Sequence, residues 1–364
     1  MRWHESEVEG FRLHSMAVPY GNEMGKGQRI RAFMRFAAAS SFKVSSLKAD
    51  VVYATSTPLT IAVPAIVGRE IVGSPYVLEV RDLWPDVPIA LGFLPRESER
   101  RAAYLLESQA YKRSSAVIAI SPGMAEDIRA KGVPAGKVHV VTHGCDPELF
   151  QEADVSDLAR DYPWATSGPL VVYTGTLGLA NGVDYLVDLA RETTVVNPSV
   201  RFAIIGDGAY RGELVRRARD NGTLDRTVFF LGGRSKEEVA KWLNVASISM
   251  VILKGPRVMW KDAGQNKFFD AISAGTAVAC NNNSWQSQVA LENGVGVRLD
   301  PVDVAKAARQ LSGALSDYDW IAGVPHRCKA LWEGDFNRDL LAQRALDILV
   351  ASSGRKRKEL PDHS

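Results

Sequence analysis

Short apolar segments alternate with helical segments twice along this chain, and this alternation restricts the possible folds more than any other sequence feature. Near-continuous apolar strands separated by helices are typical of a parallel sheet covered on both faces. We therefore predict an α/β protein with two doubly wound sheets. The expected strands are residues 51–55, 76–80, 116–120 and 138–142 in the first half, and 170–173, 201–205, 228–232, 248–252, 277–279 and 295–299 in the second.

The length of 364 residues favours two domains, since single cores stop growing beyond about 250–300 residues. Residues 146–168 are polar and rich in turn residues, which is typical of a connection between domains. The expected division is a first domain at 1–148, a linker at 149–168, a second domain at 169–325, closing helices at 326–353 and a polar tail at 354–364.

Composition and charge argue against several classes of function. A net charge of +2 argues against general nucleic-acid binding. The three cysteines are widely spaced, as is usual in a reducing compartment, and the six histidines lack the spacing of a metal site. We therefore expect a cytoplasmic protein with no metal and no nucleic-acid partner. Pro58 and Pro64 interrupt the uncharged stretch 51–68, so we interpret it as a strand and a core helix rather than a membrane span.

The segment 265–280 carries the most informative charged side chains. A short helix is expected to begin near Lys267 and to end at Gly275, directly before an apolar strand. Lys267 and Asp270 share one face of that helix, so a cation suited to phosphate lies beside a carboxylate suited to hydroxyl groups. Asp262 lies eight residues before Asp270. Capping alone also explains a carboxylate near a helix start.

Glycine turns and a charged pair follow other expected strands. Residues 175–178 connect a strand to a helix, where backbone N–H groups can approach a pyrophosphate. Neither this turn nor the turn at 206–208 has the spacing of a dinucleotide fingerprint, which argues against a nicotinamide-dependent enzyme. Arg81 and Asp82 follow the strand 76–80, at the sheet edge where α/β domains bind ligands, although they could also pair with each other.

A basic segment precedes the first of these strands. Residues 26–48 contain six cations and no acid, and their apolar residues recur at helical spacing. Such a helix can lie on an anionic membrane surface. A surface helix that packs one side on its own domain explains the pattern equally well, so both interpretations stay open.

Five motifs, in a fixed order, make this chain similar to a known family. They lie at residues 80–85, 120–124, 143–146, 173–178 and 266–271. Their order resembles that of the retaining glycosyltransferases of family 4, and within them the N-acetylfucosamine transferases of O-antigen and capsule synthesis. Asp262 and Asp270 stand where the family usually has two glutamates. The resemblance covers nearly the whole chain from Val8 onward.

This resemblance implies a GT-B fold, in which two Rossmann-like domains bind a nucleotide-sugar donor mainly on the second. It implies sugar transfer with retention, without a metal or other cofactor, to a polyprenyl-diphosphate-linked acceptor at the inner face of the cell membrane. Asp270 would bind the ribose hydroxyls and Asp262 the donor sugar. The residues expected for catalysis are Arg81, Asp82 and Asp262, and those expected for donor binding are Gly175, Thr176, Gly178, Arg211, Lys267 and Asp270.

The sequence departs from the family pattern in two places. Many members carry an arginine and a lysine where this chain has Thr176 and Asn181, so Lys267 and Arg211 are the candidates to supply charge. Arg211 is also explained as a solvated helix residue. Secondly, only one weak strand, at residues 11–18, precedes the basic helix. We therefore expect a first domain that lacks its opening strand-helix-strand unit, through a truncated gene or a misassigned start codon.

Two alternatives to an active glycosyltransferase stay open from the sequence. One is a non-catalytic remnant that binds a nucleotide sugar without transferring it. The other is a Rossmann-type oxidoreductase, which the absence of the fingerprint disfavours. Binding of NAD rather than of UDP or GDP would support that second alternative.

Overall fold

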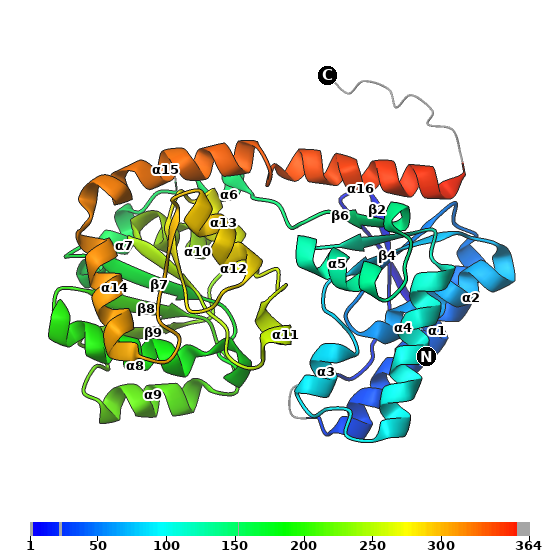
Figure 1. The fold of residues 1–364 in the computed structure, drawn as a ribbon, viewed down its shortest axis with the longest axis horizontal. Coiled ribbons are helices and arrows are strands. Elements are labelled where there is room, and N and C mark those ends of the chain that lie inside the picture. Colours follow the sequence, from blue (N-terminus) through cyan, green and yellow to red (C-terminus); the bar gives the residue numbers. More distant parts are fainter. Residues whose placement is uncertain (1–2, 22–23, 152, 355–364) are drawn as a thin grey trace. The chain divides into compact units, whose positions relative to one another are not determined.

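The computed structural model describes residues 3–21, 24–151 and 153–354, and the chain divides into two compact units (Figure 1). Of the described residues, the first unit contains those up to 141 and those at 343–354, and the second comprises residues 142–342. Helix α16 (Arg338–Ser353) therefore begins in the second unit and ends in the first. The polar tail expected at 354–364 lies outside the described residues from 355 onward.

A four-stranded parallel sheet forms the centre of the first unit. Its strands pair in the order β3-β4-β5-β6, and each lies within one of the expected segments. These strands are β3 (Val52–Thr55), β4 (Tyr76–Val80), β5 (Ala116–Ala119) and β6 (Val138–Val140). The helices are α1 (Lys26–Leu47), α2 (Ala62–Val72), α3 (Asp86–Ala90), α4 (Glu97–Arg113) and α5 (Pro122–Ala130), with 3-10 turns at Leu59–Ile61 and Ala135–Lys137.

A β-hairpin precedes α1, where the sequence predicted one weak strand. Strands β1 (His4–Val8) and β2 (Phe11–Ser15) pair antiparallel. Their two-residue turn has φ angles of 51° at Glu9 and 79° at Gly10, as a type I′ turn requires. The prediction missed β1 because its residues are mostly polar and exposed, so no apolar alternation marks it as a strand.

A six-stranded parallel sheet forms the centre of the second unit, with the order β12-β11-β10-β7-β8-β9. Helices α8 and α9 lie on one side of these strands, and α10, α12 and α13 on the other (Figure 1). The strands are β7 (Leu170–Thr174), β8 (Arg201–Ile205), β9 (Val228–Gly232), β10 (Ile248–Val251), β11 (Ala277–Cys280) and β12 (Gly296–Arg298). The helices are α6 (Pro147–Phe150), α7 (Ser156–Asp161), α8 (Val183–Val196), α9 (Arg211–Asp220), α10 (Lys236–Val245), α11 (Arg257–Trp260), α12 (Asn266–Ser273), α13 (Trp285–Glu292), α14 (Val304–Ser316) and α15 (Tyr318–Glu333), with 3-10 turns at Pro163–Ala165 and Leu179–Asn181.

Alternate residues of β7 belong to different hydrophobic clusters, because successive side chains of a strand point to opposite faces. Val171 and Tyr173 pack with residues of α8 and α14, whereas Leu170 and Val172 pack with residues of α10. The residues expected to form a linker, 149–168, contain the second half of α6, all of α7 and a 3-10 turn. Their apolar side chains join the α10 cluster, so in this structure the segment is part of the second unit.

Among the described residues, no helix is both long and apolar enough to cross a bilayer.

Candidate functional site

The strand order of the second sheet reverses between the neighbouring strands β7 and β10. Chain order runs β7-β8-β9 in one direction and β10-β11-β12 in the other. In open α/β sheets the crevice at the carboxyl ends of the strands on either side of such a reversal is where ligands bind. Gly175 directly follows β7, and the segment that carries Asp262, Lys267 and Asp270 follows β10. These residues therefore follow the two strands between which the strand order reverses.

The two glycine turns pack directly against each other. The backbone N–H of Gly175 donates to the carbonyl of Ile205 at 2.9 Å, and that of Leu177 donates to the carbonyl of Asp207 at 2.9 Å. A Cβ at Gly206 would lie 1.9 Å from the carbonyl oxygen of Gly175, so glycine is required there for close approach. The second turn, which lacks the spacing of a dinucleotide fingerprint, thus supports the first.

Thr176 and Gly178, two of the expected donor-binding residues, lie in the first turn. Thr176 is exposed, and the Tyr173 hydroxyl donates to its carbonyl oxygen at 3.1 Å. A Cβ at Gly178 would lie 2.9 Å from the Asn181 side-chain oxygen, so the Asn181 side chain lies directly against this turn. Neither Thr176 nor Asn181 carries charge, so any cation for a ligand at this turn must come from another element.

Helix α12 brings a lysine to this turn. Lys267 is only 9% exposed, and its Nζ lies 4.0 Å from the centroid of the Tyr173 ring. The same Nζ lies 3.3 Å from the position of a Cβ at Gly175. No residue in the described part of the chain accepts a hydrogen bond from this amine. The fold therefore brings the predicted lysine and the predicted glycine turn together.

Asp270 lies one turn further along α12 and binds a second lysine. Lys236 Nζ is 2.8 Å from both carboxylate oxygens of Asp270. Burial raises the pKa of the Asp270 carboxyl, and the Lys236 ammonium opposes this rise. Lys236, which begins α10 directly after the capping residue Ser235, was not among the predicted site residues. Its position just beyond the carboxyl end of β9 could have marked it as a candidate site residue.

Two further charged residues predicted for the site, Arg211 and Asp262, lie on other elements of the second unit. Arg211 begins α9, directly beyond the second glycine turn, and its Nε is buried without an acceptor among the described residues. Asp262 is 4% exposed in the segment between α11 and α12, with Lys261 Nζ 3.3 Å from its Oδ2. Both therefore belong to the second unit.

Arg81 and Asp82 lie in the first unit, at the carboxyl end of β4. Both are exposed. The Thr57 hydroxyl donates to Asp82 Oδ2 at 2.7 Å, and the backbone N–H of Arg81 donates to the Ser56 hydroxyl at 3.1 Å. The Arg81 backbone and the Asp82 side chain are thus both bound to the segment that follows β3. The catalytic roles expected for them stay predictions.

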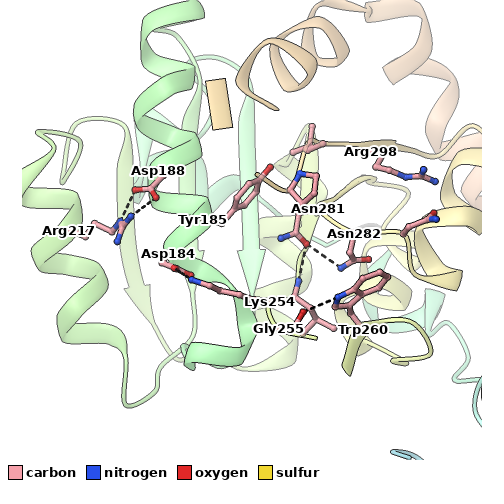
Figure 2. Close-up of a pocket in the computed structure, with 14 residues that line it drawn as sticks. Asp184, Tyr185, Asp188, Arg217, Lys254, Gly255, Trp260, Asn281, Asn282 and Arg298 are labelled. Carbon is pink, nitrogen blue, oxygen red and sulfur yellow. Dashed lines mark hydrogen bonds and ion pairs between the residues drawn. The ribbon is translucent and has the colours of Figure 1, made fainter. Parts of the chain in front are cut away.

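A separate cavity of about 570 Å³ lies in the second unit beside the carboxyl ends of β10, β11 and β12 (Figure 2). Two ion pairs stand at its wall, Lys254 with Asp184 and Arg217 with Asp188, while Trp260, Asn281 and Arg298 line the opposite side. None of the predicted donor-binding residues is among the described residues that line it. The glycine turns and the lysine beside them therefore do not line this cavity.

Solved structures with two Rossmann-like domains resemble this chain over most of its length. HepE from Anabaena, in complex with UDP and glucose, is 19% identical with a TM-score of 0.70, covering 92% of this chain and 84% of its own. Sucrose-phosphate synthase from Thermosynechococcus elongatus is 16% identical with a TM-score of 0.75, covering 94% and 84%. WaaG, a glycosyltransferase of lipopolysaccharide biosynthesis, is 16% identical with a TM-score of 0.69, covering 92% and 86%. The chain thus has the predicted GT-B fold.

The sequence itself matches two domain models of one enzyme group. Residues 2–144 match the glycosyl transferase 4-like domain, and residues 168–317 match the glycosyl transferases group 1 domain. The chain belongs to the GT-B glycosyltransferase family that joins these two domains. It is also 26% identical to the alpha-D-kanosaminyltransferase of Streptomyces kanamyceticus over 147 residues, which are 39% of this chain and 37% of that protein.

Proposed function

We propose that this protein transfers a sugar, with retention, from a nucleotide-sugar donor to a polyprenyl-diphosphate-linked acceptor during surface polysaccharide synthesis. The observation that carries the proposal is the convergence of the Gly175 turn, the Lys267 amine and the Asp270 carboxylate at the reversal of strand order in the second sheet. A lysine beside a glycine turn suits a diphosphate, and a carboxylate suits ribose hydroxyls. HepE, which shares the fold, binds UDP and UDP-glucose.

Turnover by the full chain tests this function. Purified protein would be incubated with UDP- and GDP-sugars and a short polyprenyl-diphosphate-linked acceptor, and the anomeric configuration of the product would be read by NMR. Transfer with retention supports the proposal. Donor binding without transfer would favour the non-catalytic remnant, and binding of NAD in place of UDP or GDP would favour the oxidoreductase.

Replacing Asp270 by alanine should weaken the binding of UDP or GDP. Loss of a charged hydrogen-bond partner costs about 1–3 kcal/mol, which corresponds to a factor of about 5–150 in the dissociation constant. Isothermal titration calorimetry on the full chain measures this change. An unchanged affinity would show that Asp270 serves only to pair with Lys236 and not to bind the donor.

Arg298→Ala provides the matched control for that measurement, because Arg298 lines the other cavity of the same unit and is exposed. We expect it to leave the affinity for UDP and GDP unchanged. The opposite pattern, with loss of affinity in Arg298→Ala but not in Asp270→Ala, would place the nucleotide in the cavity of Figure 2 and refute the proposed site.

We also propose that α1 binds an anionic membrane surface. One side of this helix contacts α2, while Met34 and Phe42 are 56% and 81% exposed. Arg31 and Arg35 are exposed on the same helix. Both sequence interpretations are therefore compatible, because one face packs on its own unit and another stays exposed. Exposed apolar and basic side chains together suit a bilayer surface.

Removing one of these arginines should weaken vesicle binding measurably. Each cation near an anionic surface contributes about 1 kcal/mol, so Arg31→Gln should bind vesicles of phosphatidylglycerol and phosphatidylcholine about fivefold more weakly at low salt. Cosedimentation measures the bound fraction. Arg309→Gln, an equal change of charge at an exposed position of α14, should have no comparable effect. Equal losses in both variants would mean that α1 has no special role.

A further inference from the structure

The amine of Lys267 is in an unusual position for a lysine. It is buried, it faces the Tyr173 ring, and no acceptor for it lies within hydrogen-bonding distance among the described residues. Charged amines in folded proteins are almost always paired or solvated, because burying an unpaired charge is costly. The surroundings of Lys267 in the protein therefore disfavour the ammonium form.

The charged groups around Lys267 do not remove this cost. Asp270, on the same helix, favours the ammonium, but both of its oxygens are bound by Lys236 of α10. Tyr173 of β7 supplies only the face of its ring, since its hydroxyl donates to Thr176. Asp146, which lies close enough to influence Asp270, is itself paired with Arg338. Burial outweighs these attractions and lowers the pKa of Lys267 to about 7.

We propose that Lys267 is substantially uncharged in the free protein above neutral pH and takes up a proton from solvent when a nucleoside diphosphate binds at the Gly175 turn. This inference rests on the proposed donor site. Phosphate oxygens beside the turn would supply the acceptors and the negative charge that the ammonium lacks. The neutral amine then gains one proton, and no other bond changes.

Proton uptake makes the affinity for a diphosphate depend on pH. Above the pKa of the free site the protonated fraction falls tenfold per pH unit, so the dissociation constant should rise by up to tenfold per unit between pH 8 and pH 9. The nucleoside alone carries no phosphate group, so its affinity should not depend on pH in this way. The phosphates of UDP are fully ionised in this range, because their second pKa is about 6.

Calorimetry at pH 8 in buffers of different ionisation enthalpy counts the protons. We expect the wild-type protein to take up close to one proton per UDP or GDP and none per uridine or guanosine. Lys267→Arg, which stays charged at every pH, should bind the diphosphate without proton uptake and with a constant affinity from pH 7 to pH 9. Wild-type binding without proton uptake would overturn the inference but leave the donor site intact.

A measurement without nucleotide tests the same inference independently of the donor site. The native state binds fewer protons than the unfolded state between the lowered pKa of about 7 and the ordinary lysine value, so stability from this group increases with pH in that window. The stability of Lys267→Met relative to wild type should therefore be highest at pH 7. The ratio of folded to unfolded protein in this variant, divided by that of wild type, should fall by up to tenfold per pH unit toward pH 10.

Urea titrations at pH 7, 8, 9 and 10 follow this difference, with Lys329→Met as the control. Lys329 is exposed on α15, and its substitution should give a difference from wild type that does not change with pH. If Lys267→Met does not fold, the comparison is made with Lys267→Arg, which keeps its charge throughout and should lose stability relative to wild type as pH rises. A constant difference for both Lys267 variants would show a lysine that is charged throughout and would overturn the inference, whether or not nucleotide binds.

Discussion

Gly206→Ala should destabilise the second unit by about 2–6 kcal/mol, because two separate costs fall on one methyl group. The added Cβ would lie 1.9 Å from the Gly175 carbonyl oxygen, and overpacking of this kind costs about 1–3 kcal/mol. Gly206 also has a φ of +142°, where a non-glycine residue adds about 1–3 kcal/mol of strain. Urea unfolding, with hydrogen exchange of residues 170–178 and 201–210 as a local probe, measures the loss.

The same substitution should weaken nucleotide binding, since it pushes the Gly175 turn away from Lys267. Gly212→Ala is the matched control, because Gly212 lies in α9 only six residues away and nothing lies within 4 Å of its Cβ position. In a helix, alanine is favoured over glycine by about 1 kcal/mol, so this control should be neutral or slightly stabilising. A normal urea midpoint for Gly206→Ala would contradict the close packing of the two turns.

Lys131→Met should destabilise the first unit by about 1–3 kcal/mol, the usual cost of leaving a buried carboxylate without its charged hydrogen-bond partner. Lys131 Nζ lies 2.6 Å from Glu107 Oε1 and 2.7 Å from Asp86 Oδ2, and Glu107 is only 3% exposed. Without the lysine, the Glu107 carboxylate stays buried with no compensating charge. Hydrogen exchange of the α4 amides during urea titration reports on this unit.

The pH dependence of that variant identifies the cause. Burial already raises the pKa of Glu107 and Lys131 opposes this, so loss of Lys131 should raise the pKa further. Between the unfolded and folded pKa values the native state then holds the extra proton, so stability falls as pH rises. The deficit of Lys131→Met should therefore be smallest near the ordinary glutamate pKa and should grow toward neutral pH.

Two further variants separate charge burial from general disruption. The double variant Lys131→Met/Glu107→Met should recover most of the stability, because apolar replacement of both partners of a buried pair is often neutral. Lys112→Met, at an exposed position of α4, should change stability by no more than about 0.5 kcal/mol. A deficit that persists in the double variant would assign the effect to lost packing by the lysine stem.

The sequence alone determined the elements of both sheets and the first members of the candidate site. Apolar runs marked every strand of the two parallel sheets, since burial on both faces leaves a strong local pattern. Gly175, Lys267 and Asp270 could be chosen because each stands at the end of a strand or on one helix face. The hairpin strand β1 was missed, because exposed polar strands leave no such pattern.

Only the tertiary structure decided which of these residues meet. Lys236 binds Asp270 from a different helix, and the Gly206 turn supports the Gly175 turn, because the strand order brings elements together that are distant in the chain. The burial of Lys267 over Tyr173 likewise depends on how α12 packs beyond β7. Sequence periodicity reports which face of an element is buried but not what covers it. For this reason the charge state of Lys267, on which our inference depends, could be argued only from the folded protein.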